Sequence, residues 1–136
     1  MIKMIHSYWA YIVLIVLIFA VVNAFIGLRA NKKFEAKDLR IALFALIASH
    51  IQLIFGFVAY YLSSFYDTMR AAGMGEVMKN SDLRKVLVEH PLVGIIAITL
   101  ITIGFSKHKK KTTDAAKFKT IAVFYTIALI LILSRI

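Results

Sequence analysis

The sequence predicts an all-α fold: a polytopic membrane protein whose four transmembrane helices form one up-down-up-down bundle over residues 1–136. Three observations predict this fold. The chain is 61% hydrophobic, whereas soluble domains are near half apolar. Its apolar residues fall into four long runs. The first and third loops between these runs are short, which places consecutive helices side by side and antiparallel.

The predicted spans are residues 4–28, 41–66, 86–105 and 120–134. The first three are about as long as the roughly 20 residues that a helix needs to cross a bilayer, and the fourth is shorter and needs the chain end to do so. The only charged residue within these runs is Glu89. The first run is too long for the apolar part of a signal peptide, so it is interpreted as a span.

Basic residues gather in two of the three loops. Residues 29–40 hold five lysines and arginines and residues 106–119 hold six lysines, while residues 64–85 set four basic residues against three acids. Because short basic loops stay in the cytoplasm, the middle loop and both termini are expected outside a bacterial inner membrane. The middle loop is expected to be a short interfacial helix or a plain connector, with Asn80 in the N-cap region of the third span.

The composition excludes several classes of function. A formal net charge of +10 would suit nucleic acid, but the charge is confined to loops and chain ends, so no nucleic-acid partner is expected. The absence of cysteine excludes disulfides, thiolate metal sites and cysteine nucleophiles. No acid–base pair, nucleophile constellation or phosphate loop is present, so no catalytic residue is predicted.

The four histidines point toward a function. His6 lies near the outer end of the first span, and His90, beside Pro91 in the first turn of the third span, shares that level. His50 lies nearer the middle of the second span and on a different face. His108 lies among lysines in the third loop, where a surface position facing anionic lipid is expected.

His6 and His90 each head a helical face that is rich in small residues. Gly94 and Ala97 lie on the His90 face of the third span. Gln52 and Gly56 lie on a similar face of the second span. Small residues let membrane helices pack closely, which alone would explain these faces. They also leave room for a flat cofactor, and two imidazoles on facing helices can hold a heme from both sides. An interfacial or capping role for each histidine stays open at this point.

Three segments resemble a known family. "IHSYWAYIVLI", "HIQLIFGFVAYY" and "EHPLVGIIAITLI" resemble, in order, the first three spans of one four-helix half of the heme A synthase family. The chain is also similar, over nearly its whole length, to small four-span bacterial proteins described as cytochrome b-like. The resemblance implies that His6 and His90 ligate a heme, and that Gln52 and Gly56 match the family's Gln-x-x-x-Gly pattern.

The chain departs from the heme A synthase family in three ways. That family has two such halves, whereas this chain has one. Its catalytic half carries a glutamate one turn before the first ligand histidine, where this chain has Lys3, and His50 has no counterpart in the shared pattern. The resemblance therefore implies an electron-transfer or accessory protein rather than an enzyme that oxidises heme.

Two histidine ligands predict a b-type cytochrome of a respiratory chain, because the iron then has no open position for oxygen or substrate. The heme b would lie near the outer face, with its propionates toward Arg135 and toward Arg84 or Lys85. The predicted cofactor contacts are Gly94, Ala97, Gln52, Gly56 and Arg135, the predicted iron ligands are His6 and His90, and His50 is the alternative ligand. The candidate polar wall residues are Tyr60, Tyr61 and Tyr125.

Two other classes of function stay open. One is a cofactor-free accessory or assembly subunit of a membrane complex, in which the small-residue faces are packing surfaces and His50 lies at a subunit contact. The other is a transporter or metal-handling protein that uses several histidines, although such proteins more often show broken helices or buried acids. The expected partners are the lipid bilayer and either respiratory-complex subunits or a second copy of the chain.

Overall fold

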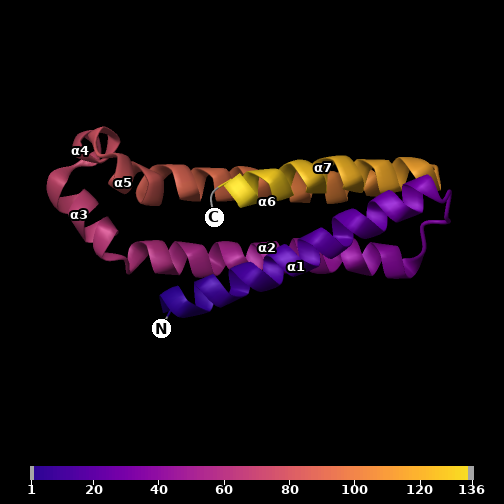
Figure 1. The fold of residues 1–136 in the computed structure, drawn as a ribbon, viewed down its shortest axis with the longest axis horizontal. Helices are drawn as coiled ribbons and strands as arrows, with labels where there is room; N and C mark the ends of the chain where they lie inside the picture. The colour runs from indigo at the N-terminus through magenta and orange to yellow at the C-terminus, as the bar shows by residue number, and fades with distance from the viewer. Residues whose placement is uncertain (1, 135–136) are drawn as a thin grey trace.

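The computed structural model describes residues 2–134, and the regular secondary structure within them is entirely helical (Figure 1). Four long helices form the body: α1 (Ile2–Arg29), α2 (Ala36–Tyr61), α6 (His90–Lys109) and α7 (Asp114–Ser134). They run alternately up and down, so the predicted all-α four-helix bundle is confirmed. Each is long and apolar enough to cross a membrane, α6 together with the helical turns that precede it from Ser81.

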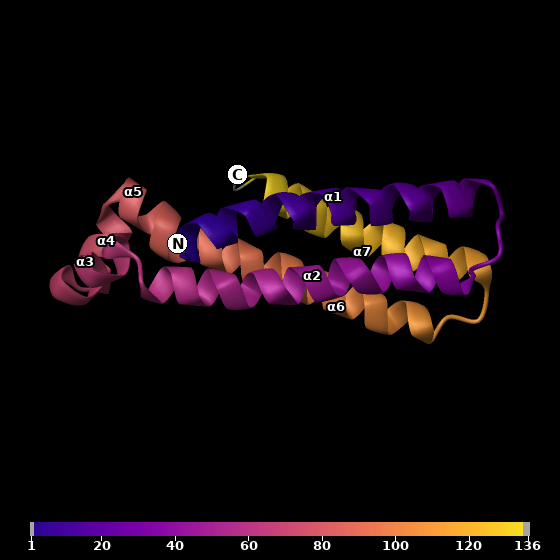
Figure 2. The same ribbon diagram turned by 90° about the horizontal axis from the view of Figure 1, so that it is seen from below.

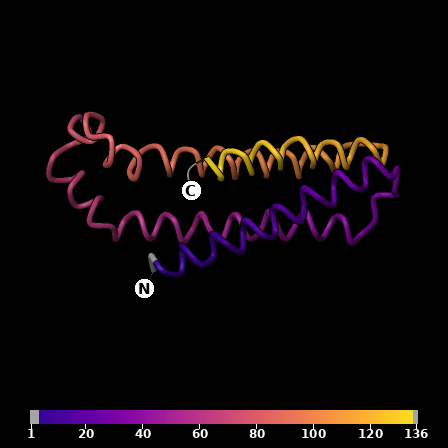
Figure 3. Tube along the Cα trace, viewed as in Figure 1, coloured from indigo at the N-terminus to yellow at the C-terminus, as the bar shows by residue number. Residues whose placement is uncertain are grey.

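Each long helix packs against two neighbours around the bundle. α1 contacts α2 and α7, whereas α6 contacts α7 extensively and α2 less extensively. The chain trace in Figure 3 shows α1 crossing α2 at an angle. Where these two helices meet, Trp9 Nε1–H donates a hydrogen bond to the carbonyl of Ala48 at 2.8 Å. Trp9 therefore fixes the crossing of α1 and α2 instead of serving only as an interfacial anchor.

A closed hydrophobic core fills the half of the bundle nearer the two short loops. Small and large residues alternate in it across the four helices. Its fully buried members include Leu17, Ala20 and Ala24 of α1, Ala42 and Ala45 of α2, Ala97 and Ile101 of α6, and Ile121 and Tyr125 of α7. The Tyr125 hydroxyl donates to the carbonyl of Ala42 at 2.8 Å, so this buried polar group is satisfied.

Two aspartates hold the short loops at this end of the bundle. Asp38 is buried and accepts from Asn23 Nδ2–H and from the Glu35 backbone N–H, both at 2.9 Å. Asp114 accepts from the Phe34 backbone N–H at 3.0 Å, which joins the first loop to the start of α7. Each carboxylate stabilises the beginning of a helix, where unpaired amides and the helix dipole favour negative charge.

The middle loop is helical, which is one of the two alternatives that the sequence left open. It contains α3 (Ser64–Ala72), α4 (Met74–Lys79) and α5 (Ser81–Arg84), followed by the π-helical turn η1 (Lys85–Glu89) that leads directly into α6. Figure 2 shows these short helices gathered beyond one end of the bundle, on the side of the two termini. The Asn80 side chain accepts from two backbone N–H groups of α5, as the predicted N-cap requires.

The helix ends differ from the ends of the apolar runs. α2 stops at Tyr61, before the predicted end at residue 66, because Ser63 leaves the helical conformation and caps α3 through its hydroxyl. α7 begins at Asp114, ahead of the apolar run from residue 120, and its 21 residues reach the roughly 20 needed for a span without further chain. Hydropathy marks where lipid begins, whereas capping residues mark where a helix begins.

The prediction that His108 is a surface residue of the third loop is wrong. α6 continues to Lys109, and His108 is only 1% exposed. Its ring packs against Phe34 and Phe105, with ring centroids 5.3 and 4.8 Å away. The lysines beside it point to the surface because they lie on other faces of the same helical turn, and positive charge there stabilises the helix C-terminus.

The fold predicts different outcomes for one substitution at two glycines of α6. A methyl group at Gly104 would collide with Phe124, whereas nothing lies within 4 Å of a methyl group at Gly94. Gly104→Ala is expected to lower the free energy of unfolding by about 1–3 kcal/mol, and Gly94→Ala to leave it unchanged or slightly higher. Thermal unfolding in detergent, followed by circular dichroism, measures both. Equal loss in the two variants would contradict this packing.

Candidate functional site

A cavity of about 790 Å³ opens between α1, α2 and α6, with α3, η1 and one residue of α7, Ile132, completing its walls. Its lining residues come from the half of the bundle that the closed core leaves free, toward the termini and the short helices. The volume lies within the range of about 300–1,000 Å³ that is typical of small-molecule sites, and such sites also combine apolar walls with a few polar groups.

His6 of α1 and His90 of α6 meet across this cavity. Their ring centroids are 6.2 Å apart and the ring planes are nearly perpendicular, at 88°. His6 is half-buried and His90 is exposed, and both line the cavity. Two histidines from distant parts of the sequence are thus brought together at one level of the bundle, as their positions in the sequence predicted.

The separation of the two rings fits one metal ion between them. An imidazole nitrogen binds a metal at about 2 Å and lies about 1 Å from the centre of its own ring, so two rings on opposite sides of an ion have centres about 6 Å apart. No three histidine, cysteine, aspartate or glutamate side chains come together anywhere in the described chain. A heme iron, unlike a bare ion, takes only its two axial ligands from the protein.

His6 and Gln52 adjoin each other on the cavity wall. Gln52 donates from Nε2 to the backbone carbonyl of His6 at 3.0 Å, which ties α2 to α1 beside the histidine. The Gln52 side chain also lies close enough to the His6 ring to interact with it. Gln52 therefore positions both the backbone and the ring of His6.

Two of the predicted glycines shape this cavity. A methyl group at Gly56 would lie 3.3 Å from His6 Cε1, so the missing side chain lets the imidazole rest against α2. Gly94 borders open space on the opposite wall. The structure therefore places Gln52, Gly56 and Gly94 on the cavity wall together with the two histidines.

One other predicted cofactor contact, Ala97, is not part of this wall. Ala97 is fully buried in the hydrophobic core, below the cavity, because α6 closes against α7 one turn inward of Gly94. Arg135 lies outside the described residues. Lys85 lines the cavity, whereas Arg84 is held away by a 3.3 Å ion pair with Glu89. Among the side chains that the structure describes, Lys85 is therefore the cation that lines the cavity.

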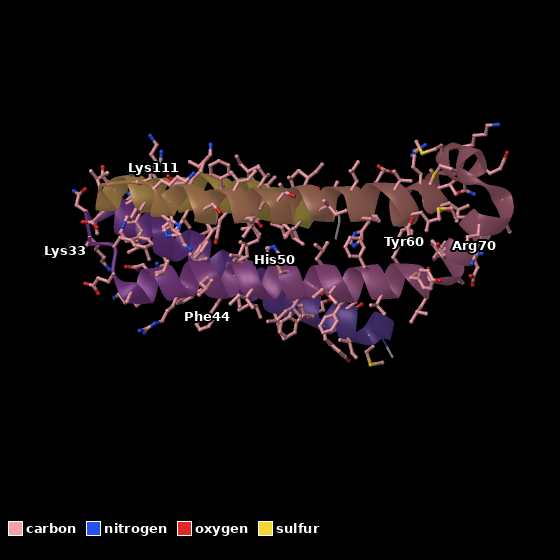
Figure 4. The ribbon with its side chains drawn as sticks, turned by 180° about the vertical axis from the view of Figure 1, so that it is seen from behind. Lys33, Phe44, His50, Tyr60, Arg70 and Lys111 are labelled. Atoms are coloured by element: carbon pink, nitrogen blue, oxygen red, sulfur yellow. The ribbon has the colours of Figure 1, made fainter. Side chains whose placement is uncertain are left out.

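His50 stands apart from the cavity. Its Nδ1 bonds to the carbonyl of Leu46 at 2.8 Å, and its Nε2 lies 3.4 Å from the Thr102 hydroxyl of α6. Figure 4 shows it near the middle of the molecule, pointing from α2 toward α6. Because Nδ1–H donates to Leu46, Nε2 can only accept, and the Thr102 hydroxyl already donates to the Ile98 carbonyl at 2.8 Å. His50 is therefore an exposed residue beside α6 that does not line the cavity.

Tyr60 and the carbonyl of Leu87 form a contact that sequence reasoning missed. Pro91 has no N–H, so the Leu87 carbonyl loses its normal i+4 donor within the helix. The Tyr60 hydroxyl supplies the missing donor at 2.9 Å, and the preceding turn widens so that His90 N–H bonds to Lys85. Of the three predicted wall tyrosines, Tyr60 alone lines the cavity, because Tyr61 is exposed and Tyr125 lies in the core.

This π-helical turn determines where His90 points. A π turn inserts one residue into a helix and changes the face on which the following residues lie, and such turns are common at functional sites. Pro91 occupies the first turn of α6, as predicted, but the helical path begins earlier, at Ser81. The signal for this contact in the sequence was the proline within an apolar run. A proline inside a helix leaves the carbonyl four residues earlier without its helical donor, so that carbonyl needs another partner.

The fold and the site together define a polytopic membrane protein with a histidine pair in a cavity between its helices. No protein-family model matches the chain, and no curated protein or solved structure is significantly similar to it. The arrangement of residues in the cavity is therefore the basis for assigning a function.

Tyr60→Phe is expected to leave the Leu87 carbonyl unsatisfied and to lower the free energy of unfolding by about 1–3 kcal/mol. Tyr61→Phe is the matched control, because Tyr61 is exposed and its ring contact with Tyr66 needs no hydroxyl. Thermal unfolding in detergent measures both variants. If Tyr60→Phe were as stable as Tyr61→Phe, the bond would not hold the π turn.

Proposed function

We propose that the protein is a membrane-embedded b-type cytochrome that holds a heme between His6 and His90 and transfers electrons. The observation that carries the proposal is the pair of histidine rings 6.2 Å apart, presented by two different helices across one cavity. A separation of this size would allow both histidines to ligate one iron.

Other features of the cavity support a heme. Its volume of about 790 Å³ and its largely apolar walls suit a flat, mostly apolar molecule. Gly56 and Gly94 leave space where side chains would otherwise fill the gap between helices. Lys85 offers an ammonium group at the outer rim, where it can pair with a carboxylate such as a heme propionate. The resemblance to one half of the heme A synthase family, noted above, is consistent with these features.

The residues of this chain would orient the two ligands and exclude water. Gln52 fixes the backbone at His6, and the π turn with Tyr60 fixes the backbone before His90. A heme with both axial positions filled supplies one-electron transfer rather than bond chemistry. The apolar wall keeps the site dry, which is one way in which a protein sets a redox potential.

The heme test compares matched histidine substitutions. The purified protein is expected to show the sharp bands of low-spin heme in a dithionite-reduced absorption spectrum. In His6→Leu and in His90→Leu, bound heme is expected to fall roughly tenfold or more, because a ligand is lost. His50→Leu makes the same change outside the cavity and should keep full occupancy.

Two results would contradict the ligand assignment. Loss of heme in His50→Leu with His6→Leu still loaded would show that the wrong histidine was chosen. A folded, wild-type protein that takes up no heme would remove the cytochrome proposal and favour a cofactor-free subunit.

We also propose that the cavity faces the outer side of a bacterial inner membrane. Figure 4 places Lys33 and Lys111 at one end of the molecule and Arg70, beside the short helices, at the other. Basic residues concentrate at the first end and mark it as cytoplasmic. The electron donor or acceptor would then approach the histidine pair from the outer side, as a soluble or membrane partner in a respiratory chain.

The absence of native cysteine allows a direct test of this orientation. In spheroplasts, a membrane-impermeant maleimide is expected to label Met74→Cys, which lies in an exposed short helix, and to leave Lys111→Cys unlabelled until the membrane is broken. The reverse pattern would place the cavity on the cytoplasmic side.

A further inference from the structure

A second pocket, of about 360 Å³, lies at the basic end of the bundle, away from the histidine pair. It lies between the start of α2, the end of α6 and the start of α7. Two lysines, Lys109 and Lys117, line it together with the buried His108, the carboxylate residue Glu35 and apolar residues that include Phe34 and Leu39. The pocket is independent of the proposed heme site.

The floor of this pocket is held in place by aromatic packing. The His108 ring lies between Phe34 and Phe105, and its Nδ1–H donates to the Phe105 carbonyl. Phe34 in turn packs on Phe118 with ring centroids 4.9 Å apart. The Phe34 backbone N–H also donates a hydrogen bond to the Asp114 carboxylate, which holds Phe34 at the start of α7. A preformed floor reduces the ordering that a ligand would have to impose on binding.

Both lysines are positioned by the same rings. Lys109 Nζ lies 4.7 Å from the centre of the Phe105 ring, and Lys117 Nζ lies 5.6 Å from the centre of the Phe34 ring. Cation–π contacts of this kind hold an ammonium group without neutralising it. The two positive charges therefore remain available at the pocket.

Among the described side chains, neither lysine forms an ion pair with a carboxylate, whereas Lys79 pairs with Glu76 and Arg84 with Glu89. The nearest other acids are used elsewhere, since Asp38 and Asp114 accept backbone and side-chain N–H groups. Glu35 offsets one of the two charges at the rim. With two lysines and one carboxylate on its walls, the pocket keeps a net positive charge.

The position of the pocket identifies the kind of anion. It lies at the end of the bundle where the four apolar helices meet the two short basic loops. The ends of helices that span a bilayer are expected near the phospholipid headgroups. One wall, at Leu39, is apolar and partly exposed. An acyl chain can pack against such a wall, whereas a free ion gains nothing from it. Basic pockets between membrane helices are suited to anionic lipid headgroups.

We propose that this pocket is a binding site for an anionic phospholipid, with Lys109 and Lys117 on the phosphate and the apolar wall at Leu39 along the acyl chain. The lysines act as two point charges on one phosphate group. Phosphatidylglycerol, an anionic lipid with a single phosphate, is the probe for the test.

The test titrates phosphatidylglycerol, phosphatidylcholine or inorganic phosphate into the full-length protein in detergent, and reads bound lipid by native mass spectrometry together with the melting temperature. Wild type is expected to retain phosphatidylglycerol selectively and to melt higher with it. In the double variant Lys109→Gln with Lys117→Gln, the apparent affinity for phosphatidylglycerol should weaken by about 30-fold. Each of the two lost charges contributes a factor of about ten or less, and the two factors multiply.

The matched control is Lys110→Gln with Lys119→Gln, which removes two exposed lysines of the same basic end that do not line the pocket. This control should bind phosphatidylglycerol nearly as well as wild type. If the glutamine pair does not fold, Lys109→Arg with Lys117→Arg keeps both charges and should bind as wild type does.

Several results would overturn the proposal. Equal loss of binding in the pocket and control pairs would show diffuse attraction to charge instead of a site. Equal retention of phosphatidylcholine would remove the anionic preference. A melting shift from inorganic phosphate as large as that from the lipid would assign the pocket to a free anion, and loss of lipid in the arginine pair would show that charge does not carry binding.

Discussion

The hydrogen bond from Tyr60 to the Leu87 carbonyl is the contact on which the geometry of the cavity depends. In a membrane protein, a carbonyl that has lost its helical donor cannot rely on water, so another part of the chain must supply a donor. Pro91 creates this demand and Tyr60 meets it from α2. The bond joins α2 to η1, the π turn that leads into α6 and precedes His90. α2 and α6 themselves pack less extensively than the other neighbouring long helices.

Small residues, alanine and glycine, produce two different environments in the two halves of the bundle. Near the short loops, alanines such as Ala24 and Ala45 let the helices close into a dry core around Tyr125. Near the termini, Gly94 faces open space, and Gly56 makes room for the His6 ring beside the cavity. The difference comes from what lies opposite. α7 supplies bulky side chains to the core but reaches the cavity only with Ile132.

Helical periodicity was sufficient to predict the residues that face inward. The faces headed by His6 and His90, and the positions of Gln52, Gly56 and Gly94, follow from about 100° per residue. The limits of the sequence appear where tertiary contacts decide. Ala97 shares the face of His90, yet it lies in the core because of where α7 packs, and the burial of His108 depends on Phe34, a residue far away in the chain. No local pattern encodes such distances.

The cavity is assembled from segments that the ribosome makes at very different times. α1, with His6, is synthesised first, and His90 follows only after α2 and the short helices of the middle loop. A nascent chain that holds α1 and α2 alone has only one histidine of the pair, His6. A ligand that is bound by the rings of both His6 and His90 must therefore be acquired after the third span has entered the bilayer. Membrane insertion of this span is then a prerequisite for forming the ligand-bound protein.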